Sequence, residues 1–145
     1  TEIHAAVESF YEGRESNKYV EHTQTCVNAL KEHFGNQAWI AERSFAHDAG
    51  FGGKCDLHAQ NIVVDIKTKD FTDPEKVSAY DENMMQLAAY RVGLGMPTAR
   101  CANIFLSRND PKIFKIIEWD QEDLDRGWQM FYAILTYWQL RNKHK

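Results

Sequence analysis

The sequence predicts an α/β domain in which a central mixed β-sheet lies between helices. Segments with helical apolar spacing alternate with short segments rich in strand-forming residues, in the order helix, three strands, helix, two strands, helix. The 145 residues are 43% hydrophobic and 26% charged, which is typical of a soluble globular domain. No internal repeat or long linker divides the chain, so we expect one domain over residues 1–145.

The first half of the chain contains one expected helix and three expected strands. The stretch before Lys18 is polar and loosely patterned, so the sequence predicts no regular element there. Apolar residues at helical spacing from Val20 to Phe34 predict a helix that Gly35 ends. Three segments rich in strand-forming residues follow, and a glycine-rich turn separates the first two. These strands are expected at residues 39–47, 54–58 and 62–68.

The second half begins with a strong helix-start signal. Asp73 followed by Pro74 predicts an N-cap and a first helical residue, and the apolar pattern continues to Leu94. Asp120 caps a final helix with a stripe of large apolar side chains, which we expect in the core rather than as a base-stacking platform. The members of that stripe include Trp128, Phe131 and Trp138. The strands between the two helices are expected at residues 102–107 and 113–119.

Charge and cysteine content exclude several classes of protein. Seventeen Lys and Arg against 21 Asp and Glu give a net charge of −4, so bulk charge does not indicate a basic nucleic-acid-binding surface. Cys26, Cys55 and Cys101 are too scattered for a disulfide framework or a zinc–thiolate site, and a cytoplasmic location fits best. No apolar run approaches the roughly 18 residues of a membrane span, so no membrane association is expected. Because the sequence begins with Thr1, we expect a processed chain or part of a longer one.

The segment from Ile62 to Lys67 is the most informative for chemistry. In a strand, Asp65 and Lys67 share one face, opposite the apolar side chains of Ile62 and Ile66. Charged groups in a strongly apolar strand are costly unless they are paired or bind a metal. The first alternative is a structural ion pair at a solvent-facing edge, and the second is a reactive site.

A second carboxylate favours the reactive site. If the strands around Asp56 and Asp65 are antiparallel neighbours, both carboxylates approach the same point. They repel each other unless a cation lies between them, and oxygen ligands favour a hard ion such as Mg²⁺. Lys67 could then orient a water molecule or steady charge on a phosphate oxygen. Gln86 and Tyr90, four residues apart on the next helix, could face the same sheet edge.

Three motifs together carry a resemblance to a known family. Gly53-x-x-Asp56, Asp65-x-Lys67 and Gln86-x-x-x-Tyr90 occur in an order and spacing that resemble the PD-(D/E)xK nuclease superfamily, closest to its RecB-like and phage-exonuclease-like branch. The resemblance covers about residues 20–119 and implies a restriction-endonuclease-like αβββαββα core. It also implies a Mg²⁺- or Mn²⁺-dependent deoxyribonuclease, with exonuclease activity in phage or bacterial recombination or repair.

The resemblance also implies roles for individual residues. Asp56 and Asp65 would hold the metal with the backbone carbonyl of Ile66, and Lys67 would help to activate water. Gln86, Tyr90 and Lys69 would contact DNA, and a recombination or helicase protein is an expected partner. Two further family positions, an acidic residue on the preceding strand and a metal-binding histidine on the first helix, would be occupied by Glu42 and His22.

Two alternatives to a nuclease stay open at this point. The first is a nucleic-acid-binding or assembly module that keeps the fold but does not cut, as the short chain and acidic balance would allow. The second is an unrelated α/β domain in which the Asp65-x-Lys67 pattern is fortuitous. Metal-dependent stabilisation and DNA cleavage are expected only for the nuclease.

Overall fold

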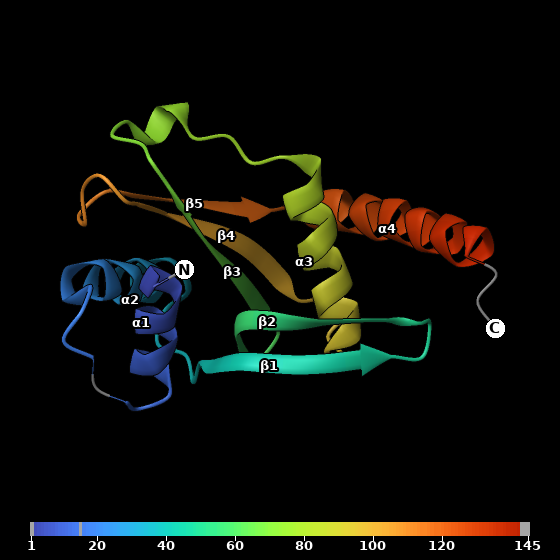
Figure 1. Cartoon of the computed structure of the whole chain (residues 1–145), viewed down its shortest axis with the longest axis horizontal. Coiled ribbons are helices and arrows are strands. Elements are labelled where there is room, and N and C mark those ends of the chain that lie inside the picture. Colours follow the sequence, from blue (N-terminus) through green and yellow to red (C-terminus); the bar gives the residue numbers. More distant parts are fainter. Residues whose placement is uncertain (1, 15, 143–145) are drawn as a thin grey trace.

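The computed structural model describes residues 2–14 and 16–142 and contains a five-stranded sheet with helices on both faces (Figure 1). The strand order is β1-β2-β3-β4-β5, with β3 and β4 parallel and the other neighbours antiparallel. The predicted α/β class with a central mixed sheet is therefore confirmed.

The order of elements agrees with the prediction except for an additional helix at the start. The helices are α1 (Glu2–Tyr11), α2 (Val20–Phe34), α3 (Asp81–Gly93) and α4 (Gln121–Arg141), with a short 3-10 helix at Pro74–Lys76. The strands are β1 (Ile40–His47), β2 (Phe51–Ala59), β3 (Ile62–Lys69), β4 (Arg100–Ser107) and β5 (Phe114–Trp119). In the part of the chain described, no helix is long and apolar enough to cross a membrane.

Helix α1 lies in the stretch for which no regular element was predicted. Ile3, Ala6 and Val7 are buried on its inner face. Their spacing, one residue followed by the positions three and four further along, is the pattern of an amphipathic helix. The prediction of a loose N-terminal segment was therefore wrong, and the short apolar pattern was the signal for this helix.

Helix α3 begins later than predicted. The Asp73 side chain does cap, because it accepts a hydrogen bond from the Glu75 amide at 3.0 Å, but it starts only the 3-10 turn. The chain is extended at Val77, and α3 begins after Tyr80, whose amide donates to the Asn83 side chain at 2.9 Å. The Asp73–Pro74 signal was real but local, since a cap does not determine how far the helix continues.

Two apolar clusters hold the helices to the sheet. On one face, α1 and α2 cover side chains of the central strands that include Leu57, Val64 and Ile66. On the other face, α3 and α4 pack on a cluster that includes Cys55 and Val63. Strand β3 is therefore covered on both sides, which explains its nearly continuous apolar sequence.

Helix α4 runs from the end of β5 toward the tip of the β1–β2 hairpin (Figure 1). Trp128 and Phe131 are half-buried, whereas Trp138 is 52% exposed. The predicted core stripe is therefore wrong at Trp138, which is more than half exposed near the C-terminal end of α4.

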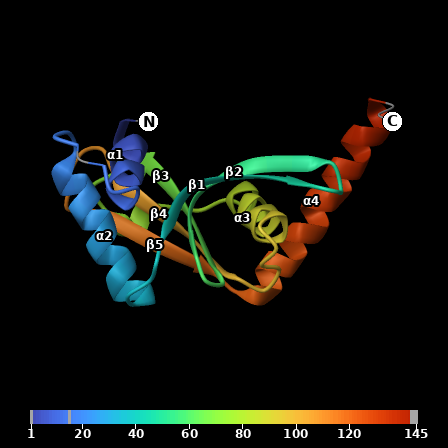
Figure 2. The same ribbon diagram turned by 90° about the horizontal axis from the view of Figure 1, so that it is seen from below.

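The β1–β2 hairpin separates from the rest of the sheet near its middle. Strand β2 pairs with β3 only from Leu57 to Ala59, whereas its pairing with β1 continues to the turn. The hairpin then runs toward α4 (Figure 2), where the Gln139 side chain donates to the carbonyl of Ala49 at 3.0 Å. The branch point between β2 and β3 is where the polar side chains gather.

Candidate active site

Asp56 lies on β2 next to the point where β2 stops pairing with β3. Its Oδ2 atom accepts a hydrogen bond from the Ile66 amide at 2.8 Å, beyond the last regular β2–β3 pair, Leu57 with Val64. The carboxylate thus satisfies a β3 amide at the place where the backbone ladder stops. The same geometry brings the Asp56 side chain beside Asp65, as the hairpin argument predicted.

Asp65 is only 4% exposed and has two polar neighbours at its Oδ2 atom. The Lys67 ammonium lies 3.2 Å away and the Asn103 amide donates at 3.1 Å. The Asn103 oxygen in turn accepts from the indole of Trp119 at 2.9 Å. Asn103 was not predicted as a site residue, although a buried amide within an apolar strand carries the same signal that identified Asp65.

The surroundings of Asp65 disfavour its charged form. Burial raises the pKa of Asp65 to about 7, the negative charge of Asp56 adds to the increase, and Lys67 opposes it. The two carboxylates therefore compete for charge at neutral pH in the absence of a cation. A bound divalent cation would relieve this repulsion.

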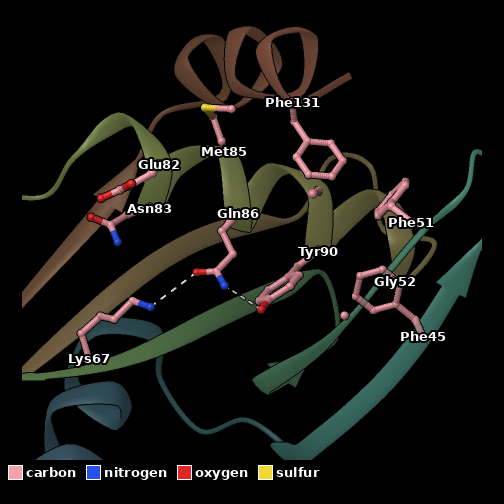
Figure 3. Close-up of a pocket in the computed structure, with 12 residues that line it drawn as sticks. Phe45, Phe51, Gly52, Lys67, Glu82, Asn83, Met85, Gln86, Tyr90 and Phe131 are labelled. Atoms are coloured by element: carbon pink, nitrogen blue, oxygen red, sulfur yellow. Dashed lines mark hydrogen bonds between the residues drawn. The ribbon is translucent and has the colours of Figure 1, made fainter. Parts of the chain in front are cut away.

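A chain of polar contacts connects Lys67 to α3 (Figure 3). The Lys67 ammonium donates to the Gln86 carbonyl oxygen at 3.5 Å, and the Gln86 amide donates to the Tyr90 hydroxyl at 2.8 Å. Gly53 leaves room for the Tyr90 side chain, because a Cβ atom at position 53 would lie 2.9 Å from the Tyr90 ring. Glycine at the start of the Gly53-x-x-Asp56 motif thus has a steric reason.

The histidine beside the acidic pair is His4 rather than His22. On α1, the His4 imidazole contacts the Ile66 carbonyl oxygen, and its Nε2 lies 3.7 Å from the Asp56 carboxylate. Burial lowers the pKa of His4 and so favours the neutral ring, the form that binds metals. The His22 ring instead bonds the carbonyl of Ser107 at the end of β4, at 2.9 Å, so the structure does not bring it to the acidic pair.

Glu42 belongs to a neighbouring acidic group. It lies between Ala41 and Arg43, which pair with β2, but has a left-handed backbone, with φ of 56°, and its side chain pairs with Lys54 at 3.2 Å. It also contacts the buried Glu8 of α1, where burial and the Glu42 contact raise the pKa of Glu8 to about 7. Glu8, four residues after His4 on α1, was not predicted because its helix was not.

Two other cationic side chains, Lys69 and Arg91, lie away from the acidic pair. The Lys69 ammonium is near the Ser78 carbonyl at 3.4 Å and over the Tyr80 ring, on the segment that leads to α3. Arg91 is 1% exposed and holds α3 to α4. Only Lys67 of these three lies at the acidic pair.

The donor set suits a hard divalent cation. Two carboxylates and a backbone carbonyl supply oxygen atoms, and His4 supplies a neutral nitrogen. Within residues 2–14 and 16–142, no group of three or more His, Cys, Asp and Glu side chains is arranged to hold a metal. The donors contact one another instead, and a cation would replace these internal contacts.

Asn103→Leu tests whether the amide behind Asp65 tunes the site. Loss of the Asn103 donor removes a hydrogen bond to the charged carboxylate, so the pKa of Asp65 should rise further. We expect the rising limb of any activity–pH profile to move to higher pH while far-UV circular dichroism stays unchanged. An unmoved profile in a folded variant would show that Asn103 only fills space.

Comparisons with known proteins give likenesses to solved structures. No protein-family profile matches the sequence, and no curated protein matches it. A crystal structure of a Eubacterium rectale protein with a provisional exonuclease name is similar, with a TM-score of 0.64, 13% identity and coverage of 99% of this chain and 67% of that one. A structure of the protein SSO0001 has a TM-score of 0.41 and 17% identity, and the match covers 78% of this chain and 56% of the other. The chain therefore shares the α/β fold of the Eubacterium rectale protein.

Proposed function

We propose that this chain is a divalent-metal-dependent deoxyribonuclease that hydrolyses DNA phosphodiester bonds, as an exonuclease in phage or bacterial recombination or repair. The observation that carries the proposal is the meeting of Asp56, Asp65 and Lys67 at the branch between β2 and β3. The Eubacterium rectale protein, with its exonuclease name and similar fold, supports the same choice. DNA is the proposed substrate, and a recombination or helicase protein is the proposed partner.

The proposed metal ligands are Asp56, Asp65, the Ile66 carbonyl and His4. His4 takes the role that the sequence had suggested for His22, because it lies at the Ile66 carbonyl and beside Asp56. When bound, Mg²⁺ or Mn²⁺ neutralises phosphate charge and lowers the pKa of coordinated water.

The remaining polar side chains position the reacting groups. Lys67 reaches between Asp65 and Gln86, so its ammonium can donate to a phosphate oxygen or hold the attacking water. Gln86 and Tyr90 fix the far side of Lys67 through their own hydrogen bond. These contacts hold the Lys67 ammonium between Asp65 and helix α3.

A non-catalytic DNA-binding module is the second candidate. This candidate is favoured because the proposed metal ligands already have protein partners. Lys67 pairs with Asp65, and the Ile66 amide donates to Asp56. Such a module would bind DNA without metal-dependent cleavage. The following experiment separates the two candidates.

Cleavage assays with a lysine variant test the proposed function. The purified chain is incubated with linear and circular double-stranded DNA and with single-stranded DNA, in Mg²⁺, Mn²⁺ or EDTA. We expect metal-dependent degradation that needs ends, and a rate about 100-fold lower in Lys67→Met, because the positioned donor is lost. Lys112→Met, at an exposed position in the β4–β5 turn, is the matched control and should cleave like the wild type. No cleavage by the wild type in either metal would contradict the proposal.

A further inference from the structure

An aromatic-lined pocket adjoins the Lys67 end of the acidic site. It lies between the β1–β2 hairpin, α3 and α4 (Figure 3), with a volume of about 520 Å³. That volume is within the range of about 300–1,000 Å³ that small-molecule sites occupy. Lys67, Gln86 and Tyr90 belong both to this pocket and to the polar chain described above.

One wall of the pocket is a row of aromatic rings. Starting at Tyr90 beside the acidic pair, neighbouring ring centroids lie 5.8 Å apart to Phe45, 5.9 Å to Phe51 and 5.1 Å to Phe131. Each of these rings is half-buried, so part of each remains available to a ligand. Behind them, Trp128 stacks on Phe131 at 5.9 Å with an interplanar angle of 25°. The row offers flat apolar surface of the kind that stacks on bases.

Along α3 before Tyr90, the pocket lining is polar and carries little positive charge. Asn83 and Gln86 present side-chain amides, which can donate to and accept from the edge of a base. Among the residues that line the pocket, all within the described part of the chain, Lys67 alone is cationic and stands at the end nearest Asp65. The interior therefore suits a neutral flat ring better than a phosphate, while a phosphate is better placed at the Lys67 end.

We propose that this pocket receives one unpaired base of the DNA strand whose phosphate lies at the Asp56–Asp65–Lys67 cluster. The chain would then act on single strands or frayed ends. A base in a duplex must be unstacked and unpaired to enter such a pocket, and this cost is lowest when the base is already single-stranded. The cleavage half of this statement rests on the proposed function, whereas base binding in the pocket does not.

Binding in EDTA tests the pocket without cleavage. The probes are a fluorescein-labelled eight-nucleotide oligothymidylate, the same strand with one abasic position moved along it, and a blunt 12-base-pair hairpin. We expect the single strand to bind more tightly than the hairpin, and one abasic position to weaken binding about ten-fold. Phe131→Leu removes the ring but keeps most of the packing volume, and should weaken binding of the intact strand by the same factor.

The controls link the effect to the pocket. Tyr132→Leu, at the next helix position outside the pocket lining, should bind like the wild type. Phe51→Leu, on the hairpin, is the second variant if Phe131→Leu fails to fold. Phe131→Leu should bind the abasic strand as tightly as it binds the intact strand. The reason is that the Phe131 substitution and the abasic position remove the same contact, which can be lost only once.

The two proposals fail in different ways. Equal affinity of Phe131→Leu, Phe51→Leu and the wild type for the intact strand would overturn the pocket assignment even if metal-dependent cleavage occurs. Affinities independent of the abasic position would overturn it as well. Coupling between Phe131 and one abasic position in a protein that never cleaves DNA would support the pocket and contradict the nuclease.

Discussion

Asp65→Asn should abolish DNA cleavage and, in the absence of metal, stabilise the folded protein above pH 7. The asparagine keeps the size of the side chain but cannot supply the charge that a cation requires. Changes to groups that merely support metal ligands cost 10–100-fold in affinity or activity. We therefore expect cleavage to fall by about 100-fold or more when the proposed ligand itself is changed.

The effect on stability follows from the raised pKa of Asp65. The folded pKa is about 7 and the unfolded value is about 3.9. Between about pH 4 and pH 7 the folded protein keeps a proton that the unfolded chain has released, so wild-type stability falls as pH rises through that window. The full penalty is present above pH 7, with an upper bound of about 4 kcal/mol, and asparagine does not have it.

Urea unfolding in EDTA at pH 4.5 and pH 8.5 measures this difference. Asp65→Asn should be more stable than the wild type at pH 8.5, and the gap should close at pH 4.5, where Asp65 of the wild type is itself protonated and carries no charge for burial to disfavour. Glu32→Gln, at an exposed position near the end of α2, should follow the wild type at both pH values. Mn²⁺ should raise the melting temperature of the wild type but not of Asp65→Asn. Equal stability of the two proteins at pH 8.5 would show that the carboxylate is not destabilised.

The sequence predicted the parts of the site that depend on local geometry. Asp65 and Lys67 share a face because strand side chains alternate, and their contact at 3.2 Å follows directly. The position of Asp56 beside Asp65 was predicted because a short connection joins their strands, and strands joined in this way pair antiparallel. The α/β class followed from the order of the patterns, which is also a local property.

The residues that were missed come from distant parts of the chain. Asn103 lies opposite Asp65 because β3 and β4 pair in parallel across a long connection, and that register is not written in either strand. His4 reaches Ile66 over 62 positions, from a helix that only three buried apolar residues reveal. His22 was chosen because the resemblance implies a histidine on the first helix and residues 20–34 were the first helix predicted, yet the His22 ring bonds the end of β4. Strength of pattern does not decide which helix covers the site.

Arg91→Ala is expected to have the largest effect on stability. The Arg91 side chain is 2% exposed, and its guanidinium donates to the Ala99 carbonyl at 3.1 Å, the Gln121 side chain at 2.6 Å and Asp125 at 2.9 Å. It therefore joins α3, the loop before β4 and α4. Truncation leaves a cavity and removes all three bonds, so we expect a loss of about 3–5 kcal/mol of the free energy of unfolding.

Two further variants separate the causes. Arg91→Met fills most of the volume without the hydrogen bonds and should lose about 1–3 kcal/mol. Asp125→Ala should lose less than about 1 kcal/mol, because Asp125 is 72% exposed and water can take its place beside Arg91. Urea unfolding measures all three, and a loss below about 1 kcal/mol in Arg91→Ala would contradict the assignment.

A folded Arg91→Met should still bind metal, because the proposed ligands lie on β2, β3 and α1. Its cleavage rate should fall, because α3 carries Gln86 and Tyr90, which position Lys67.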